Sequence, residues 1–213
     1  MPALGAGGRE FESLIRDQRT MDFIRLENII DSSIADYIEQ QVYAIPYVYN
    51  SSTVYGQKSD PHSYFDQQVQ EDGQFVHYAF HSGRRTSDIL DILTHPLDVM
   101  CEYSKFRISA LLRVKINFTW ARPDFNGNHY NQPHKDDRSG CKSMVYYINQ
   151  STGPTVLFNE YHQGHKHPEK LTEFARINPM KNSALLFDSD RYHASSNSSK
   201  GIRIVANYIF EVK

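Results

Sequence analysis

The sequence predicts a mainly β protein with flanking helices and a jelly-roll core. Aromatic residues make up 13% of the 213 residues, with 14 Tyr and 12 Phe, and such side chains favour strands. The second half of the chain carries short strand-like runs separated by clusters of Gly, Pro, Asn and Ser. Helical patterns are confined to the first half. Together these observations predict a β-core with helices packed on one of its sheets.

The length of the chain fits one domain with a sizeable core. Residues 1–10 are expected to form a flexible tail. Residues 11–213 are expected to form the domain, with helical and strand support over 11–105 and the jelly-roll core over 106–213.

The first half alternates helical and extended patterns. Asp31 is a typical N-cap, and apolar residues recur at helical spacing from Ile34 to Val42, before Pro46. Pro96 interrupts a second helical pattern, which predicts one kinked helix or two short ones. In order, we expect a weak helix over 11–22, a strand over 23–26, a helix over 31–43, an extended segment over 47–49, a long polar loop over 50–74, a strand over 75–80 and helical structure over 87–103.

From residue 106 onward the pattern is that of strands. Over residues 108–120, apolar side chains alternate with Arg113, Lys115 and Asn117, so these three share one face. A strand with a polar inward face typically lines a site, so Arg113 and Lys115 could contact a substrate, although they could equally be solvated at a rim. Further strands are expected over 142–149, 155–158, 174–177, 184–187 and 202–211.

Composition excludes several classes of protein. The formal net charge of −2 gives no reason to expect nucleic acid or an anionic membrane as a partner. The first residues lack the charged start and apolar core of a secretory signal, and no apolar run approaches ~18 residues. We therefore expect a soluble, cytoplasmic protein. Cys101 and Cys141 have no CxxC spacing, and no serine-hydrolase, P-loop or dinucleotide motif is present.

Three residues form a candidate metal site. His134 and Asp136 are separated by one residue, so an extended backbone directs both side chains to the same side. A predicted turn after a buried strand would deliver His193 to the mouth of the jelly roll, although an ordinary turn residue on the surface is the alternative. Two histidines and one carboxylate on one side of a metal are the ligand set of non-haem Fe(II) oxygenases. A second group, His162, His165 and His167, is interpreted as a solvated loop.

Arg203 is a candidate anion-binding residue. It lies in the apolar run 202–210, where alternation puts it on one face with Val205 and Asn207. A buried arginine requires an anionic partner. Either a protein carboxylate or the carboxylate of a ligand would fit its guanidinium group.

The order of these motifs resembles the Fe(II)/2-oxoglutarate-dependent dioxygenases, and within them the prolyl-4-hydroxylase-like group. His134-x-Asp136 is followed by a strand, then by His193, then by Arg203 ten residues later. The run 144–149 and the following Gly153-x-Thr155 are similar to the strand and turn after the metal motif in that group. The resemblance covers about residues 107–211 and implies a double-stranded β-helix, the cupin-like form of the jelly roll.

The resemblance also implies a role for each matched residue. Fe(II), 2-oxoglutarate and O2 are the implied cofactors, and a peptidyl proline, a free amino acid or a small metabolite the implied substrates. An aspartate in the ligand set favours hydroxylation, because related halogenases lack this carboxylate. The resemblance implies that iron is bound by His134, Asp136 and His193. It also implies that the C5 carboxylate of 2-oxoglutarate is bound by Arg203 and Tyr147, and, more weakly, that its C1 end is bound by Asn117.

Two other classes of protein remain open. One is a non-catalytic jelly-roll module that binds a metal or a sugar, and the other is a cupin-type metalloenzyme. Arg203 and Tyr147 discriminate against the binding module, which has no need of a carboxylate clamp. Cupins usually present three or four histidine ligands, and this chain offers two at matched positions. Residues 50–74 and 121–132 are expected to flank the mouth of the site and to determine specificity.

Overall fold

The computed structural model describes residues 22–54, 72–125, 128–164 and 168–213. The expected tail, nearly all of the expected helix over 11–22, most of the loop over 50–74 and two of the three clustered histidines lie outside these ranges. Neither of the two helices in the described ranges has the length and apolar character of a transmembrane span.

The larger of two antiparallel sheets contains eight of the strands in the described ranges. Four of its strands, β1 to β4, come from the first half of the chain and extend it beyond the predicted core: β3 pairs with β5, and β1 pairs with β9. The order is β1 (Ile24–Leu26), β9 (Ser183–Asp188), β6 (Cys141–Tyr147), β11 (Ile202–Val212), β5 (Ile108–Trp120), β3 (Gln74–His81) and β2 (Val48–Asn50), with β4 (Arg84–Arg85) paired to β3.

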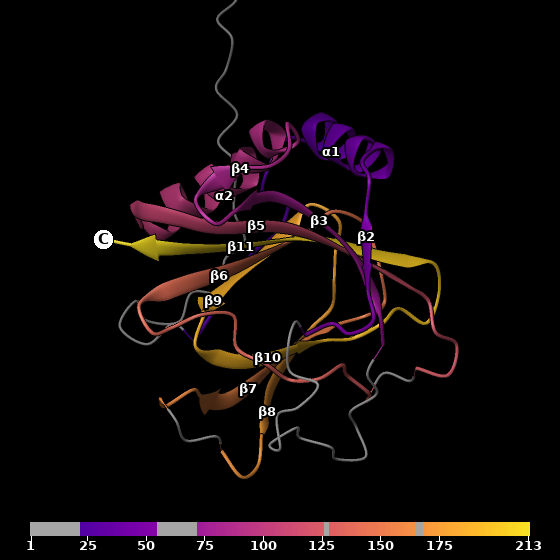
Figure 1. Cartoon of the computed structure of the whole chain (residues 1–213), viewed down its shortest axis with the longest axis vertical. Helices are drawn as coiled ribbons and strands as arrows, with labels where there is room; N and C mark the ends of the chain where they lie inside the picture. The colour runs from indigo at the N-terminus through magenta and orange to yellow at the C-terminus, as the bar shows by residue number, and fades with distance from the viewer. Residues whose placement is uncertain (1–21, 55–71, 126–127, 165–167) are drawn as a thin grey trace, which may run out of the picture.

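The smaller sheet lies opposite the larger one and contains β10 (Arg191–Ser195), β7 (Thr155–Tyr161) and β8 (Glu173–Ile177) in that order. Figure 1 shows the two sheets as separate layers, with the smaller one on the side away from the helices. The sequence predicted a turn around His193, and the structure has strand β10 there instead. The turn prediction failed because the polar composition of this strand reflects buried contacts: Arg191 is 1% exposed and donates to the carbonyl of Phe158.

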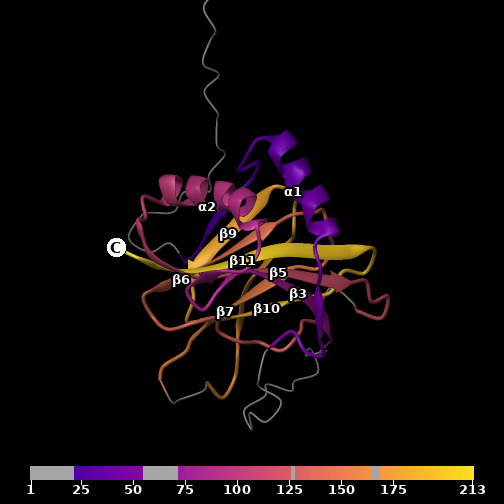
Figure 2. The same ribbon diagram turned by 45° about the horizontal axis from the view of Figure 1, so that its top comes forward.

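Helices α1 (Ser32–Ala44) and α2 (Leu90–Ser104) cover the outer face of the larger sheet (Figure 2). The Asp31 carboxylate accepts a hydrogen bond from the backbone N–H of Ser33, which confirms the predicted N-cap. Pro96 lies within a single helix, the first of the two alternatives. The helices bury apolar residues such as Ile38 and Leu93 against the sheet.

Alternation along the central strands gives the larger sheet two different faces. Tyr208 on β11 and Ile116 on β5 pack under the helices, whereas Val205 and Tyr147 face the smaller sheet. Arg203 and Asn207 share that inner face and line the space between the sheets. The face assignments made from the sequence are confirmed, as are the mainly β class and the jelly-roll arrangement.

Candidate metal centre and anion site

A pair of backbone hydrogen bonds brings the two histidines together. The N–H of His134 donates to the carbonyl of His193 at 2.9 Å, and the N–H of His193 donates to the carbonyl of His134 at 2.8 Å. This antiparallel bridge joins the segment before β6 to β10, although the residues are 59 positions apart in the sequence. Their ring centroids lie 4.5 Å apart. The bridge therefore fixes the spacing of two candidate ligands through the backbone.

Each histidine ring is oriented by a backbone carbonyl. Nδ1 of His134 lies 3.2 Å from the carbonyl of Gln132, and Nδ1 of His193 lies 3.1 Å from the carbonyl of Arg191. A carbonyl only accepts, so Nδ1 of each ring carries the proton and Nε2 keeps its lone pair. This is the tautomer that a metal-binding histidine needs. Burial, with His193 as the next contribution, lowers the pKa of His134 to about 3, so the ring is neutral at ordinary pH.

Asp136 is held as a carboxylate by three donors. Its Oδ1 accepts from Arg113 at 2.7 Å, and its Oδ2 accepts from Ser143 at 2.7 Å and Asn207 at 3.3 Å. Burial alone would raise the pKa of Asp136, but Arg113, the two histidines and Ser143 together hold that pKa well below its ordinary value. The carboxylate is therefore charged and fixed in orientation.

The three side chains meet at one point. Single ligand atoms from His134, Asp136 and His193 all lie within 4.8 Å of one another, and His193 Nε2 is 3.5 Å from Asp136 Oδ2. Two imidazoles and one carboxylate on one side of a point suit Fe(II) and leave the other coordination positions open. The donor set thus fits a catalytic iron centre.

Arg203 is buried at the other end of the same space without a carboxylate partner among the described residues. It is 3% exposed, its Nε donates to the carbonyl of Gly153 at 2.9 Å, and one terminal nitrogen donates to Thr155 Oγ1 at 3.0 Å. Burial lowers the pKa of Arg203, which is the energetic cost of a cation with no counter-ion. The first alternative from the sequence, a protein carboxylate, is not found within the described ranges. The second alternative, a ligand carboxylate, stays a prediction.

Tyr147 stands behind this arginine. Its hydroxyl donates to Thr155 Oγ1 at 2.8 Å, and its ring centroid lies 5.9 Å from the guanidinium carbon of Arg203. Thr155 accepts from both neighbours, so its own O–H is left to donate into the cavity. The sequence suggested that Tyr147 contacts the ligand directly, whereas the structure puts Thr155 between the Tyr147 hydroxyl and the cavity.

One cavity connects the three candidate metal ligands His134, Asp136 and His193, together called the metal cluster, to Arg203. It spans about 450 Å³ including its open mouth, and it receives Lys115 and Asn117 from β5. Asn117 Oδ1 has no hydrogen-bond partner among the described residues. The lining is completed by Thr53, Gln74, Arg113, His134, Asp136, Val145, Thr155, His193, Ala194, Ser195, Arg203, Val205 and Asn207.

Several of these residues were not assigned a site role from the sequence. The contact of Arg113 with Asp136 joins β5 to the segment before β6, and no local pattern reveals that the two lie together. Thr53 and Gln74 belong to residues 50–74, which were expected to flank the mouth of the site, and both line the cavity. The sequence did contain a signal for Asn207, because alternation along residues 202–210 placed its side chain on the same face as that of Arg203.

Comparison with known proteins gives structural matches only. No family model matches the sequence, and no curated protein matches it significantly. Among solved structures, an oxidoreductase of the 2OG-Fe(II) oxygenase family from Burkholderia pseudomallei is 12% identical, with a TM-score of 0.63, over 91% of this chain and 86% of that one. The chain has the fold of the 2OG-Fe(II) oxygenases.

Two further matches differ in their reactions while sharing the oxygenase fold. A prolyl hydroxylase from Trichoplax adhaerens, in complex with a peptide fragment of the hypoxia inducible factor oxygen degradation domain, is 15% identical, with a TM-score of 0.58, over 91% of this chain and 84% of that one. The alpha ketoglutarate dependent epimerase SnoN of nogalamycin biosynthesis is 10% identical, with a TM-score of 0.58, over 91% of this chain and 79% of that one. At these identities the likeness concerns the fold.

Proposed function

We propose that this protein is an Fe(II)- and 2-oxoglutarate-dependent dioxygenase that hydroxylates a small molecule or a peptidyl substrate. The observation that carries the proposal is the presence, in one cavity, of a His-Asp-His cluster and of a buried arginine with no carboxylate partner in the described part of the chain. A metal would bind to the His-Asp-His cluster, and a dicarboxylate would supply the carboxylate that the arginine lacks. The oxygenase fold supports the same conclusion.

His134, Asp136 and His193 would hold the iron. With O2, bound Fe(II) and 2-oxoglutarate supply the oxidising chemistry, in which 2-oxoglutarate is converted to succinate and CO2 and a substrate C–H bond is hydroxylated. Arg113 and Ser143 orient the aspartate, and two backbone carbonyls orient the histidines. These contacts fix the ligand atoms before the metal arrives, which lowers the cost of binding it.

Arg203 would bind the C5 carboxylate of 2-oxoglutarate, assisted by Thr155. The arginine is oriented by the carbonyl of Gly153, and Thr155 is oriented by Tyr147. Tyr147 therefore acts as a positioning residue, and Asn117 remains a candidate for the C1 end of the cosubstrate. Because both donors are already desolvated, the carboxylate gains charge-assisted hydrogen bonds without a further desolvation cost to the protein.

The alternative is a jelly-roll module that binds a metal or a sugar without turnover. Such a module would have no use for a buried cation in the same cavity as the metal cluster. A buried arginine without a carboxylate destabilises the fold, and its burial here is explained by a ligand that supplies the carboxylate. The structure therefore favours the dioxygenase over the binding module.

The test is succinate formation from 2-oxoglutarate under air with added Fe(II). Wild type should form succinate, and both His134→Ala and Arg203→Met should lose most of that activity. Metal binding, measured separately with Mn(II) by paramagnetic relaxation of water, should be lost in His134→Ala and retained in Arg203→Met. Wild-type protein that binds no metal, or that forms succinate no faster than His134→Ala, would refute the proposal.

A further inference from the structure

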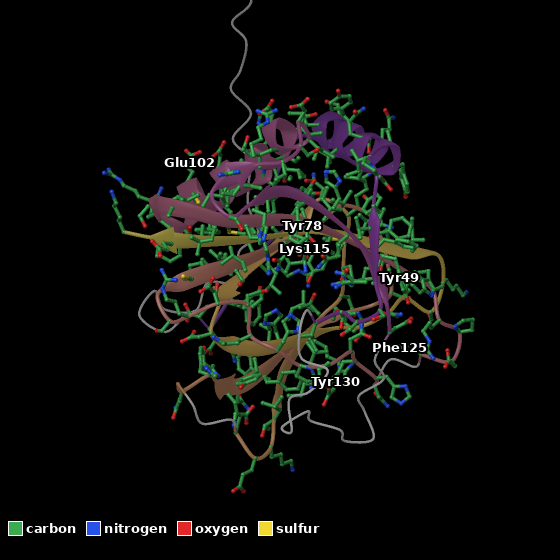
Figure 3. The ribbon with its side chains drawn as sticks, viewed as in Figure 1. Tyr49, Tyr78, Glu102, Lys115, Phe125 and Tyr130 are labelled. Carbon is green, nitrogen blue, oxygen red and sulfur yellow. The ribbon has the colours of Figure 1, made fainter. Side chains whose placement is uncertain are left out.

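Lys115 is a second cation in the cavity that the proposed chemistry leaves unused. It is 9% exposed and lines the cavity from the middle of β5. Figure 3 shows it beneath β5, in the space between the two sheets. Within the described ranges its ammonium group makes no hydrogen bond and no ion pair. Burying an ammonium group in this way is unfavourable unless a ligand supplies the counter-charge.

The strand register places Lys115 near the metal cluster and away from Arg203. Lys115 pairs with Asn207, whose side chain contacts the metal-ligand carboxylate of Asp136. Arg203 pairs with Thr119, four residues farther along both strands, which corresponds to about 13 Å between the α-carbons. The two cations therefore serve different parts of the cavity.

The charges that line the cavity are unbalanced among the described residues. These residues supply the cations Arg113, Lys115 and Arg203 and a single carboxylate, Asp136. Arg113 is already paired with that carboxylate. A divalent iron and a dianionic 2-oxoglutarate would cancel each other, so two positive charges would still be in excess. Arg203 would share its charge with the cosubstrate, and Lys115 would still face the open part of the cavity.

We propose that Lys115 binds an anionic group of the primary substrate, and that this substrate is a small carboxylic acid such as a free amino acid. This inference rests on the proposed dioxygenase function and narrows its substrate class. An internal peptidyl residue other than Asp or Glu has no carboxylate to offer at this depth. Because Lys115 lies beside the metal cluster, the oxidised carbon must be within a few bonds of the carboxylate.

The test measures binding rather than turnover. The protein is loaded with Mn(II) and 2-oxoglutarate without oxygen, and free amino acids and short aliphatic acids are added, each beside its own primary amide. Bound Mn(II) accelerates the relaxation of ligand protons that come close to it, so proton NMR reports both affinity and proximity to the metal. The matched variants are Lys115→Met, Arg203→Met and Lys200→Met, the last removing an exposed lysine outside the cavity.

At least one acid is expected to show relaxation that its amide does not show. Lys115→Met should weaken the binding of that acid by ~10-fold or more, the usual size of a lost charged hydrogen bond, and Lys200→Met should bind it like wild type. Equal binding of acid and amide, or the absence of any binding acid while 2-oxoglutarate still binds, would overturn the inference.

The affinity for 2-oxoglutarate separates the remaining outcomes. If Lys115→Met loses 2-oxoglutarate as severely as Arg203→Met does, Lys115 belongs to the cosubstrate site and the substrate assignment is wrong. If wild type binds neither Mn(II) nor 2-oxoglutarate, the dioxygenase proposal itself fails, whatever the acids do. Thermal unfolding of each variant checks that it is folded.

Discussion

Replacing Lys115 with methionine is expected to stabilise the ligand-free protein, most strongly at acidic pH. Burial, reinforced by Arg113 and opposed by Asp136, lowers the pKa of Lys115 from 10.5 to about 7. Methionine has a similar length and no charge, so it keeps the packing and removes the cost of burying an ammonium group. The change thus isolates the electrostatic part of the lysine's contribution.

The sign and size of the effect follow from the pKa. Between about pH 7 and pH 10.5 the unfolded chain binds the lysine proton and the folded chain does not, so the wild type gains stability as the pH rises. Near pH 6 both states are protonated, and the native state bears the full cost, ~4–5 kcal/mol at 1.36 kcal/mol per pH unit. Near pH 9 about 2 kcal/mol remains. The gain in the free energy of unfolding from Lys115→Met should therefore be smaller at pH 9 than at pH 6 by ~2–3 kcal/mol, or ~5–10 °C in Tm.

Guanidinium unfolding followed by the fluorescence of the single tryptophan, Trp120, would measure this difference. The protein would be kept in EDTA and without 2-oxoglutarate, so that ligand binding does not contribute. Lys200→Met, which removes an exposed lysine, should show no pH-dependent difference from wild type. A Lys115→Met variant that is no more stable than wild type near pH 6, or whose advantage does not change with pH, would refute the reasoning.

Three further predictions concern the clamp and the scaffold. With Mn(II) present, 2-oxoglutarate at 100 times its Kd should stabilise wild type by ~2.7 kcal/mol, and the same concentration should leave the Tm of Arg203→Met unchanged; an equal shift would contradict the clamp. Gly153→Ala would put a methyl group 2.3 Å from the carbonyl oxygen of Ser196, so urea unfolding should show a loss of ~2 kcal/mol or more together with weaker 2-oxoglutarate binding, and an unchanged midpoint would exclude this contact. Asp31→Ala removes the N-cap of α1 and should cost ~1 kcal/mol in urea unfolding without changing Mn(II) affinity; a change in that affinity would link the helix to the site.

The strands that carry the site were predictable because alternation survives where one face is apolar and the other is polar. On β5 and β11 the sequence identified which residues share a face, and the structure confirms it. The same alternation placed Arg203 and Asn207 together. Strand faces follow from a local period of two residues, so no long-range information was required.

The contacts that build the metal cluster depend on long-range pairing, which local patterns do not encode. The backbone bridge between His134 and His193 joins β10 to a segment that the sequence suggested only as extended. Strand β10 itself was predicted as a turn, because polar residues flank His193 in the sequence, although Tyr192 and Ala194 pack in a buried hydrophobic cluster. Local propensity fails here because function and buried hydrogen bonds determine which residues occupy the remaining positions of the strand.

The two buried cations link the stability of this fold to its ligands. Arg203 and Lys115 each lower the stability of the ligand-free protein, because desolvation of their charge is not offset by a carboxylate in the described part of the chain. A ligand that supplies the carboxylate recovers this free energy on binding, so part of its affinity is stored in the folded protein beforehand. The two sites differ in position along β5 and β11, and so they can recover it from two different carboxylates. Recognition of the proposed substrate acid and of the proposed cosubstrate would then depend on separate residues of the same sheet face.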